Sequence, residues 1–404
     1  MMNNVVKMQD GKTIPAGYKW TEVGVIPEDW SVDSIGNLLS ITTGKKNTQD
    51  RVDDGIYPFF VRSQTIEKIN SYSFDGEGVL TAGDGVGTGK VFHYIKGKFD
   101  FHQRVYLIYN FPETIDGYFF YILFSNHFYD RIMSMTAKSS VDSVRREMIA
   151  DMKITFPPKN EQTAIALVIS DTDALINALE RLITKKQAIK TATMQQLLTG
   201  RTRLTQFAKN PDGTLKGHRP SELGSIPEDW EAVPFKDVLT IKHGKNQKEV
   251  ESPSGQYPIY ATGGQIGNAT SFLFDKPSVL IGRKGTIDKP RYTDTPFWTV
   301  DTLFYSEIKK NTCVKFIYYK FCMIDWMQYN EASGVPSLNA HTIENVLAVL
   351  PNIEEQTAIT TILSDMDAEL ETLEKKLAKI RHIKQGMMQQ LLTGRIRLPL
   401  EQQS

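Results

Sequence analysis

Cysteine is almost absent from this sequence, with only Cys313 and Cys322 among 404 residues. Two isolated cysteines exclude a disulfide framework and a zinc knot, so we expect both to be small core residues. Long apolar runs are absent as well. Because no stretch of about 18 uncharged apolar residues occurs, and residues 1–12 lack a basic-then-apolar signal pattern, we expect a cytoplasmic protein with no membrane partner.

The sequence also lacks an excess of charge of either sign, since 47 Lys and Arg balance 47 Asp and Glu. Domains that bind nucleic acid usually carry a basic excess, so this balance alone argues against a nucleic-acid binder. Hydrophobic residues make up 40% and charged residues 23% of the chain, which excludes a disordered or collagen-like protein. The length suffices for two domains, each with its own core.

The chain does contain an internal repeat, which has to be found before any fold is assigned. Both ends of a module recur, whereas the stretch between them differs from one copy to the other. We therefore expect one scaffold that presents two different binding surfaces. The recurring pairs are residues 17–30 with 217–230, which share Ile-Pro-Glu-Asp-Trp, residues 162–204 with 356–398, and the identical segments 194–201 and 388–395.

The stretches between the repeats are rich in Gly, Tyr, Phe and Val. Short apolar runs such as Val105–Tyr109 and Ser278–Ile281 lie between clusters of Gly, Asp and Asn, which is typical of short strands joined by turns. Longer amphipathic stretches at Tyr118–Met133 and Val314–Tyr329 predict one helix in each copy. We expect each stretch to fold as a globular α+β domain of ordinary size.

The second repeated segment of each copy has apolar residues at heptad spacing, which predicts a long helix with one apolar seam. Only Lys384 interrupts the seam of the second copy, and Leu175, Leu182 and Ile189 are expected to widen that of the first. The seam positions are Ile165, Ile169, Thr172, Ile176, Leu179, Ile183, Lys186, Lys190, Thr193 and Leu197, and then Ile359, Leu363, Met366, Leu370, Leu373, Leu377, Ile380, Lys384, Met387 and Leu391.

Prolines and glycines predict where these helices begin and end. Pro157-Pro158 and Pro351 precede them, and Gly200 and Gly394 follow them. Each helix would be about 60 Å long at 1.5 Å per residue. Each needs a partner for its seam, and the nearest partner is the other copy in the same chain, packed antiparallel.

We therefore predict an α+β protein with an internal pseudo-two-fold repeat, in which two globular recognition domains are separated by two long antiparallel helices that resemble a coiled coil. The predicted boundaries are residues 1–158 for the first recognition domain, 159–204 for the first repeated helical region, 205–216 for a linker, 217–352 for the second recognition domain, and 353–404 for the second helical region and C-terminal tail.

No catalytic pattern stands out. Asp84–Val91 resembles a phosphate-binding loop, but Asp84 replaces its first glycine and Val91 replaces the Ser or Thr that would hold Mg²⁺, so we interpret it as a glycine-rich turn. Pro211-Asp212 is interpreted as a turn in the linker. The seven His residues show no metal spacing. We expect no catalytic residue, no metal site and no cofactor bound by this chain.

Clusters of basic and amide side chains lie in the predicted loops of both recognition domains. Arg or Lys suits guanine edges, Asn or Gln suits adenine edges, and loop Lys and Ser position phosphates. The candidate DNA-binding residues are Lys45, Lys46, Asn47, Arg62, Ser63, Gln64, Lys90, His102, Gln103 and Arg104 in the first domain, and Lys245, Asn246, Gln247, Lys248, Gln265, Arg283, Lys284, Asn339 and His341 in the second.

The whole arrangement resembles the specificity subunit of type I restriction-modification systems. The similarity covers essentially the full chain, and its motifs are specific because they occur in tandem and in this order. The residues that carry it are Ile26–Trp30 and Ile226–Trp230, Glu161-Gln162 and Glu355-Gln356, and Met194–Arg201 and Met388–Arg395.

This resemblance implies partners and a target. Members of the family bind a bipartite double-stranded DNA sequence, one half per recognition domain, with a spacer whose length depends on the helices. Two methylation subunits that use S-adenosylmethionine dock on them, and a motor-nuclease restriction subunit that uses ATP and Mg²⁺ joins for restriction. The two recognition domains resemble different subtypes, which implies an asymmetric target. The alternatives are a coiled-coil adaptor with two protein-binding domains and an enzyme with an unrecognised active site.

The net charge of zero is not spread evenly along the chain. Residues 17–161 and 217–355 each carry a net charge of −3, whereas residues 162–204 and 356–398 carry +3 and +2. Mildly acidic recognition domains do not supply the nonspecific electrostatic affinity that a lone DNA binder needs. We therefore expect the isolated chain to bind DNA poorly, and its partner subunits to complete a basic clamp.

Overall fold

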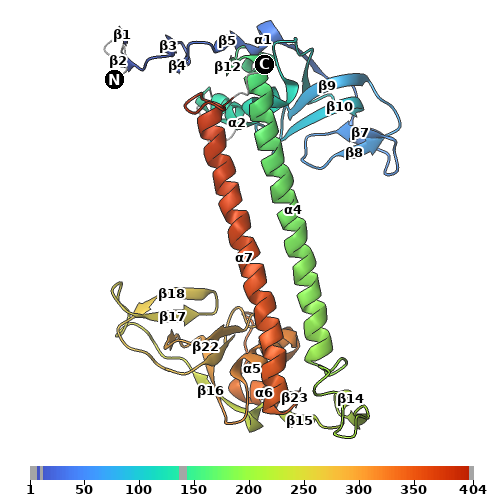
Figure 1. The fold of residues 1–404 in the computed structure, drawn as a ribbon, viewed down its shortest axis with the longest axis vertical. Helices are drawn as coiled ribbons and strands as arrows, with labels where there is room; N and C mark the ends of the chain where they lie inside the picture. Colours follow the sequence, from blue (N-terminus) through green and yellow to red (C-terminus); the bar gives the residue numbers. More distant parts are fainter. Residues whose placement is uncertain (1–6, 10–11, 136–142, 400–404) are drawn as a thin grey trace. The chain divides into compact units, whose positions relative to one another are not determined.

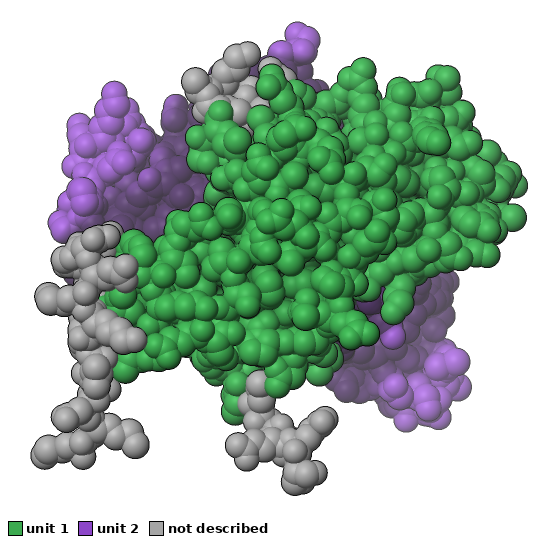
Figure 2. All heavy atoms as spheres, turned by 90° about the horizontal axis from the view of Figure 1, so that it is seen from above, with its two compact units in different colours: residues 1–178, 377–404 green, residues 179–376 purple. Residues whose placement is uncertain are grey.

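The computed structural model describes residues 7–9, 12–135 and 143–399. The chain forms two compact units (Figure 2): unit 1 comprises residues 1–178 and 377–404, and unit 2 comprises residues 179–376. Each unit therefore contains the residues of one predicted recognition domain and a part of each long helix. Within the described ranges, no helix is both long and apolar enough to cross a membrane.

Unit 1 starts with small antiparallel pairs of strands. Three such pairs precede or flank the main sheet, and the last of them joins the start of the recognition domain to its end. The elements are β1 (Lys7–Gln9) with β2 (Lys12–Ile14), β3 (Tyr18–Thr21) with β4 (Gly24–Pro27), and β5 (Ser31–Ser34) with β12 (Lys153–Phe156), together with the short helices α1 (Ile35–Leu38) and α3 (Arg146–Ala150).

The main sheet of unit 1 has six strands in the order β6-β11-β9-β10-β7-β8, with only β10 and β7 parallel. Figure 1 labels four of them, β9, β10, β7 and β8. Alternation sends Val79 and Ile108 into a core beneath helix α2 and sends Leu80 and Leu107 to the opposite face. The elements are β6 (Ser40–Thr43), β7 (Tyr57–Phe60), β8 (Glu67–Ile69), β9 (Phe74–Ala82), β10 (Phe92–Phe101), β11 (Val105–Tyr109), α2 (Gly117–Ser134) and the 3-10 turn η1 (Thr48–Asp50).

Unit 2 repeats this plan with a divided sheet. A four-stranded sheet has the order β16-β22-β19-β20, and a three-stranded sheet has the order β18-β17-β21. The elements are β13 (His218–Ser221), β14 (Gly224–Pro227), β15 (Glu231–Pro234), η2 (Phe235–Asp237), β16 (Leu239–His243), β17 (Tyr257–Ala261), β18 (Gly264–Ala269), β19 (Ser278–Gly282), β20 (Arg291–Thr293), β21 (Trp298–Thr299), β22 (Leu303–Ile308), α5 (Val314–Met323), η3 (Trp326–Tyr329), α6 (Ala340–Asn345) and β23 (Leu347–Leu350).

The predicted strands and the first predicted helix are confirmed, since β11, β19 and α2 cover them. The second predicted helix is wrong in its last part. Helix α5 ends at Met323 because Ile324 is extended, and the Asp325 side chain then caps a separate 3-10 turn by accepting from the Met327 N–H at 3.2 Å. The cysteine prediction is wrong for Cys322, which is exposed, whereas Cys313 is half-buried and packs against the core of unit 2.

The two long helices are α4 (Lys159–Leu197) and α7 (Ile353–Leu391), each of 39 residues. Both begin after the predicted prolines. The predicted glycines follow their ends with positive φ, +73° at Gly200 and +67° at Gly394, a conformation that glycine adopts without strain. The helical segments within each unit are antiparallel: in unit 2, Lys186 pairs with Glu369 at 2.7 Å and Lys190 pairs with Asp367.

The Lys residues at polar seam positions form ion pairs, and equivalent pairs occur within each unit. In unit 1 the Lys384 ammonium lies 2.5 Å from Asp173, and in unit 2 Lys190 and Asp367 form the equivalent pair. A charged pair in an apolar seam selects one register, because other registers leave the charges unpaired. Lys384, the interruption in the seam, is thus paired in the folded chain.

The apolar seam is confirmed by burial, but its predicted widening is wrong. Leu175, Leu182 and Ile189 are exposed on α4 and do not join the seam. The equivalent positions of α7 are Glu369, Lys376 and Ile383. The buried seam residues are Ile165, Ile169, Ile176, Leu179, Ile183, Leu197, Ile359, Leu363, Leu370, Leu377 and Leu391.

A charged clamp in each unit joins the end of one long helix to the start of the other. In unit 2, Arg203 donates to both carboxylate oxygens of Glu355 at 2.7 Å and also binds Asp229. In unit 1, Arg397 binds Glu161 and Asp29 in the same way. These clamps use residues from all the recurring ends of the module, which gives a physical reason for their recurrence.

Candidate nucleic-acid interface

Equivalent backbone hydrogen bonds hold the loops that carry most of the predicted binding residues in both units, and we call these bonds the framework. In unit 1 the Gly83 N–H donates to the Arg104 carbonyl at 2.8 Å, and the Gly83 carbonyl accepts from Val144 at 2.7 Å. In unit 2 the Arg283 N–H donates to the Thr302 carbonyl at 2.8 Å, and the Arg283 carbonyl accepts from Leu338 at 3.0 Å. Position 83 of unit 1 therefore corresponds to position 283 of unit 2.

The next residue extends the correspondence and reverses the charge. Asp84 forms an isolated bridge with Ser143, and Lys284 forms the same bridge with Ser337. The framework thus presents Gly-Asp in one unit and Arg-Lys in the other. Two copies of one backbone arrangement that differ in the charge they present are suited to binding two different ligands.

In unit 1, Asp84 holds two of the predicted arginines. Its carboxylate accepts from Arg62 at 2.7 Å and from Arg104 on its other oxygen. Burial opposes ionisation of Asp84, but the hydrogen bonds from Arg104 and Arg62 outweigh it and lower the pKa of the carboxyl below its usual value. Both guanidinium groups remain substantially exposed, so they are oriented but available to an external acceptor.

The amide candidates of unit 1 lie beside this group. Gln103 donates from Nε2 to Oδ1 of Asn47 at 2.6 Å, and the Gln103 N–H donates to the Lys46 carbonyl at 2.8 Å. Lys45 precedes them and is exposed. The structure thus brings together residues that lie about 60 positions apart in the sequence.

His102 is the candidate of this group that lies inside the domain. It is buried, and its Nδ1 accepts the Arg104 N–H at 3.0 Å. Burial, together with the nearby charge of Arg62, lowers the pKa of His102. A neutral imidazole in this place supports the turn that presents Gln103 and Arg104.

The remaining candidates of unit 1 have separate positions. The hydroxyl of Ser63 donates to the Thr65 carbonyl at 3.0 Å, and Gln64 is exposed. The Lys90 ammonium lies 5.7 Å from the ring centroid of Tyr129 on α2, so its side chain lies against that helix.

In unit 2 the structure places Arg283 and Lys284 on the equivalent framework. The Arg283 guanidinium donates to the Asp301 carbonyl at 3.3 Å, and Lys284 is exposed. A second group follows strand β16: the Lys245 carbonyl accepts from Trp298 Nε1 at 2.9 Å, and the side chain of Asn246 accepts from the Lys248 N–H at 3.0 Å.

Gln247 belongs to the β16 group, and the three other candidates of unit 2 lie on β18 and at the start of α6. Gln265 on β18 is exposed and donates to Asn268 Oδ1 at 3.0 Å. Asn339 caps α6 by accepting from Thr342 at 2.8 Å and donates to Glu331, so its amide is already bonded within the protein. His341 is exposed on α6.

Sequence reasoning missed Asp84 and Val86 as parts of this surface. Both belong to the glycine-rich segment that was interpreted as a turn. That interpretation is confirmed, because the Thr88 N–H donates to the Gly85 carbonyl and the Lys90 N–H donates to the Gly87 carbonyl, each at 3.0 Å. The signal was present: the segment departs from a phosphate-binding loop by an acidic residue at the first glycine position.

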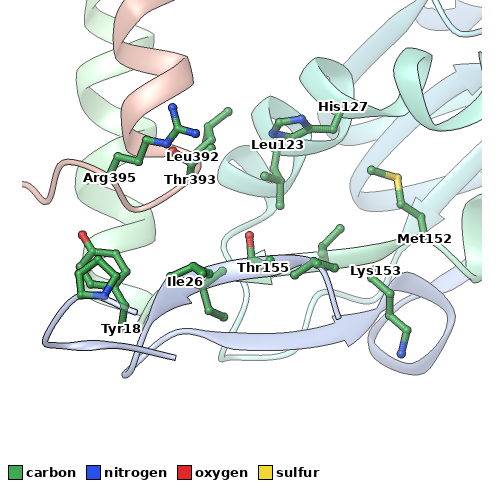
Figure 3. A pocket seen from close by; sticks show the side chains of 15 residues that line it. Tyr18, Ile26, Leu123, His127, Met152, Lys153, Thr155, Leu392, Thr393 and Arg395 are labelled. Atoms are coloured by element: carbon green, nitrogen blue, oxygen red, sulfur yellow. The ribbon is translucent and has the colours of Figure 1, made fainter. Parts of the chain in front are cut away.

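A different pair of cavities is lined by the repeated segments. Figure 3 shows the one in unit 1, of about 760 Å³, where Tyr18, Ile26, Leu123 and Arg395 come from β3, β4, α2 and the segment after α7. Unit 2 has an equivalent cavity of about 560 Å³ beside Lys320. Neither includes a predicted DNA-binding residue.

These features define the class of the protein. It is a duplicated α+β protein whose two units share one loop framework and differ in the side chains that this framework carries. Among the residues that the structure describes, no group of three or more His, Cys, Asp or Glu could hold a metal ion.

Comparison with known proteins identifies the family. The profile of the type I restriction modification DNA specificity domain matches residues 27–191 and 227–382, and the chain belongs to this family. It is 25% identical to the type I restriction enzyme EcoDI specificity subunit of Escherichia coli, over 92% of this chain and 90% of that one. It is 26% identical to the MjaVIII specificity subunit of Methanocaldococcus jannaschii, over 92% of this chain and 94% of that one.

The fold is shared with a solved structure as well. The crystal structure of the S subunit of a type I restriction-modification system from M. genitalium matches with a TM-score of 0.66 and 17% identity, over 90% of this chain and 96% of that one. The predicted fold class is therefore confirmed: recognition domains of mixed helix and sheet, together with two long helices.

Proposed function

We propose that this chain recognises a bipartite, asymmetric sequence in double-stranded DNA, with one half bound by each recognition domain. The observation that carries the proposal is the pair of equivalent frameworks that present Asp84 in unit 1 and Lys284 in unit 2. Side chains at equivalent positions meet equivalent places on a ligand, so unlike side chains select unlike sequences. The candidate residues of both domains supply the guanidinium, ammonium and amide groups that bind base edges and phosphates.

We propose further that the chain itself is not catalytic. The chemistry would be supplied by two methylation subunits that bind S-adenosylmethionine and by a motor-nuclease subunit that uses ATP and Mg²⁺. The names of the relatives support this assignment, because they describe specificity subunits of type I restriction enzymes. Such a complex would act on DNA in the cytoplasm.

The exposed apolar residues of α4 support the docking of a partner. Leu182 and Ile189 of unit 2 lie seven residues apart along one face of α4, and both are exposed. A row of exposed apolar residues at heptad spacing is suited to packing against a further helix. We propose that a helix of a methylation subunit covers this face.

The family assignment does not favour a coiled-coil adaptor with two protein-binding domains. A direct experiment separates the two functions: the full chain, alone and with its methylation subunits, is titrated with random DNA at several salt concentrations. A DNA-recognition subunit gives salt-dependent association in the complex and weak association alone, because its recognition domains carry a net negative charge. No salt-dependent association of the complex would contradict the proposal.

A further inference from the structure

Val86 is an apolar side chain held out into solvent. It is 97% exposed, in the turn between β9 and β10. The turn cannot rearrange to bury the Val86 side chain. Gly85 and Gly89 have φ of +79° and +67°, and a Cβ at Gly87 would lie 2.6 Å from the Arg62 carbonyl oxygen, so the backbone is fixed by close packing.

Arg62 lies beside the same turn, and Asp84, which precedes Gly85, joins Arg62 to Arg104. A Cβ at Gly85 would lie 3.9 Å from the Arg62 guanidinium, which also binds Asp84 together with Arg104. Val86 therefore projects from a rigid turn beside an arginine pair. Hydrophobic and bidentate donor groups are thus presented next to each other.

The charge of this group is suited to bases more than to phosphates. The carboxylate of Asp84 offsets one of the two guanidinium charges, so the group attracts a phosphate less than two unpaired arginines would. The Asp84 carboxylate also fixes the orientation of each guanidinium group and leaves further N–H donors on each arginine. An oriented guanidinium matches O6 and N7 of guanine in the major groove, and an apolar side chain matches the 5-methyl group of thymine.

We infer that Val86 and the Asp84-bound arginines select the base sequence bound by the first recognition domain. This half of the target contains a thymine contacted by Val86 next to a guanine contacted by Arg104. This inference rests on the proposed function and specifies its target chemistry. The second domain differs at these positions, because it presents Arg283 and Lys284 on the equivalent framework.

The experiment uses the full chain in complex with its methylation subunits and a duplex that carries the mapped target. Each thymine in both halves is replaced in turn by deoxyuridine, which removes only the methyl group. One replacement in the first half should weaken binding about 4-fold, the factor that corresponds to burial of one methyl group. In the Val86→Ala variant most of this effect should disappear. Val335→Ala is the matched control, because Val335 is an exposed valine in a loop of the second domain.

The guanine contact is tested with 7-deazaguanine, which lacks the N7 acceptor. One replacement next to the sensitive thymine should weaken binding on the order of 10-fold in the wild-type complex and much less in Arg104→Ala. Binding to the second half, scanned in the same complexes, shows that the variants are folded.

The outcomes separate the inference from the proposed function. If the complex binds its target but no thymine is sensitive in the first half, or if the sensitivity is unchanged in Val86→Ala, the inference is wrong and the proposed function stands. If the complex binds no specific DNA, both are wrong.

Discussion

Removing Arg203 should destabilise unit 2 much more than removing its equivalent destabilises unit 1. The Arg203 side chain is 8% exposed and Glu355 is 1% exposed, so Arg203→Ala leaves a carboxylate buried without its cation. Loss of one partner from a buried ion pair costs about 3–5 kcal/mol. Trp230 Nε1 also donates to Glu355 at 3.0 Å, but one neutral donor does not balance a buried charge.

The equivalent residue of unit 1 supplies the matched control. Glu161 is 2% exposed and thus as buried as Glu355, but Arg397 is 37% exposed, so its truncation opens a path for water beside the carboxylate. We expect Arg397→Ala to cost about 1–2 kcal/mol, between the values for surface and buried pairs. The two variants thus remove equivalent residues of one chain and differ mainly in how deeply the removed arginine is buried.

Hydrogen–deuterium exchange measures both effects in the intact chain, because it reports on each unit separately. The amides in the first turns of α7, from Glu355 onward, should exchange at least about 100-fold faster in Arg203→Ala, which corresponds to about 3 kcal/mol. Adding Glu355→Gln should restore part of the protection by removing the unpaired charge. An effect below about 1 kcal/mol, or no recovery with Glu355→Gln, would refute the reasoning.

Three further predictions follow from other parts of the structure. Burial opposes ionisation of Asp229, but hydrogen bonds from Arg203 and Lys216 outweigh it and lower the pKa of the carboxyl to about 2. Its contribution to stability is therefore complete above about pH 4 and lost as the pH falls towards 2, and an acid titration of Asp229→Asn should lack this loss. Burial lowers the pKa of Lys320 from 10.5 to about 8. The unfolded state thus binds more protons between these values, and the wild type should gain stability relative to Lys320→Leu as the pH rises from about 8 to about 10.5 in urea titrations. Deletion of residues 172–175 shortens α4 by about 6 Å and should shorten the preferred spacer or abolish methylation, whereas an unchanged spacer would contradict a measuring role for the helix.

Much of the fold could be predicted from the sequence because it depends on local signals. Heptad spacing, prolines and glycines placed α4 and α7 to within a few residues, and the repeat placed two similar domains. The same pattern gave no way to see that Leu175, Leu182 and Ile189 face away from the seam. A stripe of apolar residues gives the same sequence pattern whether it packs in a core or is exposed on the surface.

The binding surface was harder to predict because it depends on pairing between distant strands. The basic clusters indicated loops, but only the hydrogen-bonded framework joins Arg62 to Arg104 through Asp84. Nor could the sequence distinguish the buried His102 from its exposed neighbours. The acidic residue at the first glycine position distinguished the segment from a phosphate-binding loop, but only the contacts of Asp84 with Arg62 and Arg104 show what it does.

The central claim is that the two surfaces bind the two halves of one target independently. Base-resolution mapping of methylation in cells that contain the chain and its methylation subunits tests it most directly, with Arg104→Ala and Arg283→Ala as the variants. The claim predicts an asymmetric bipartite sequence in the wild type, relaxed in one half by Arg104→Ala and in the other half by Arg283→Ala. A symmetric or continuous sequence, or a change of both halves by either variant, would contradict it.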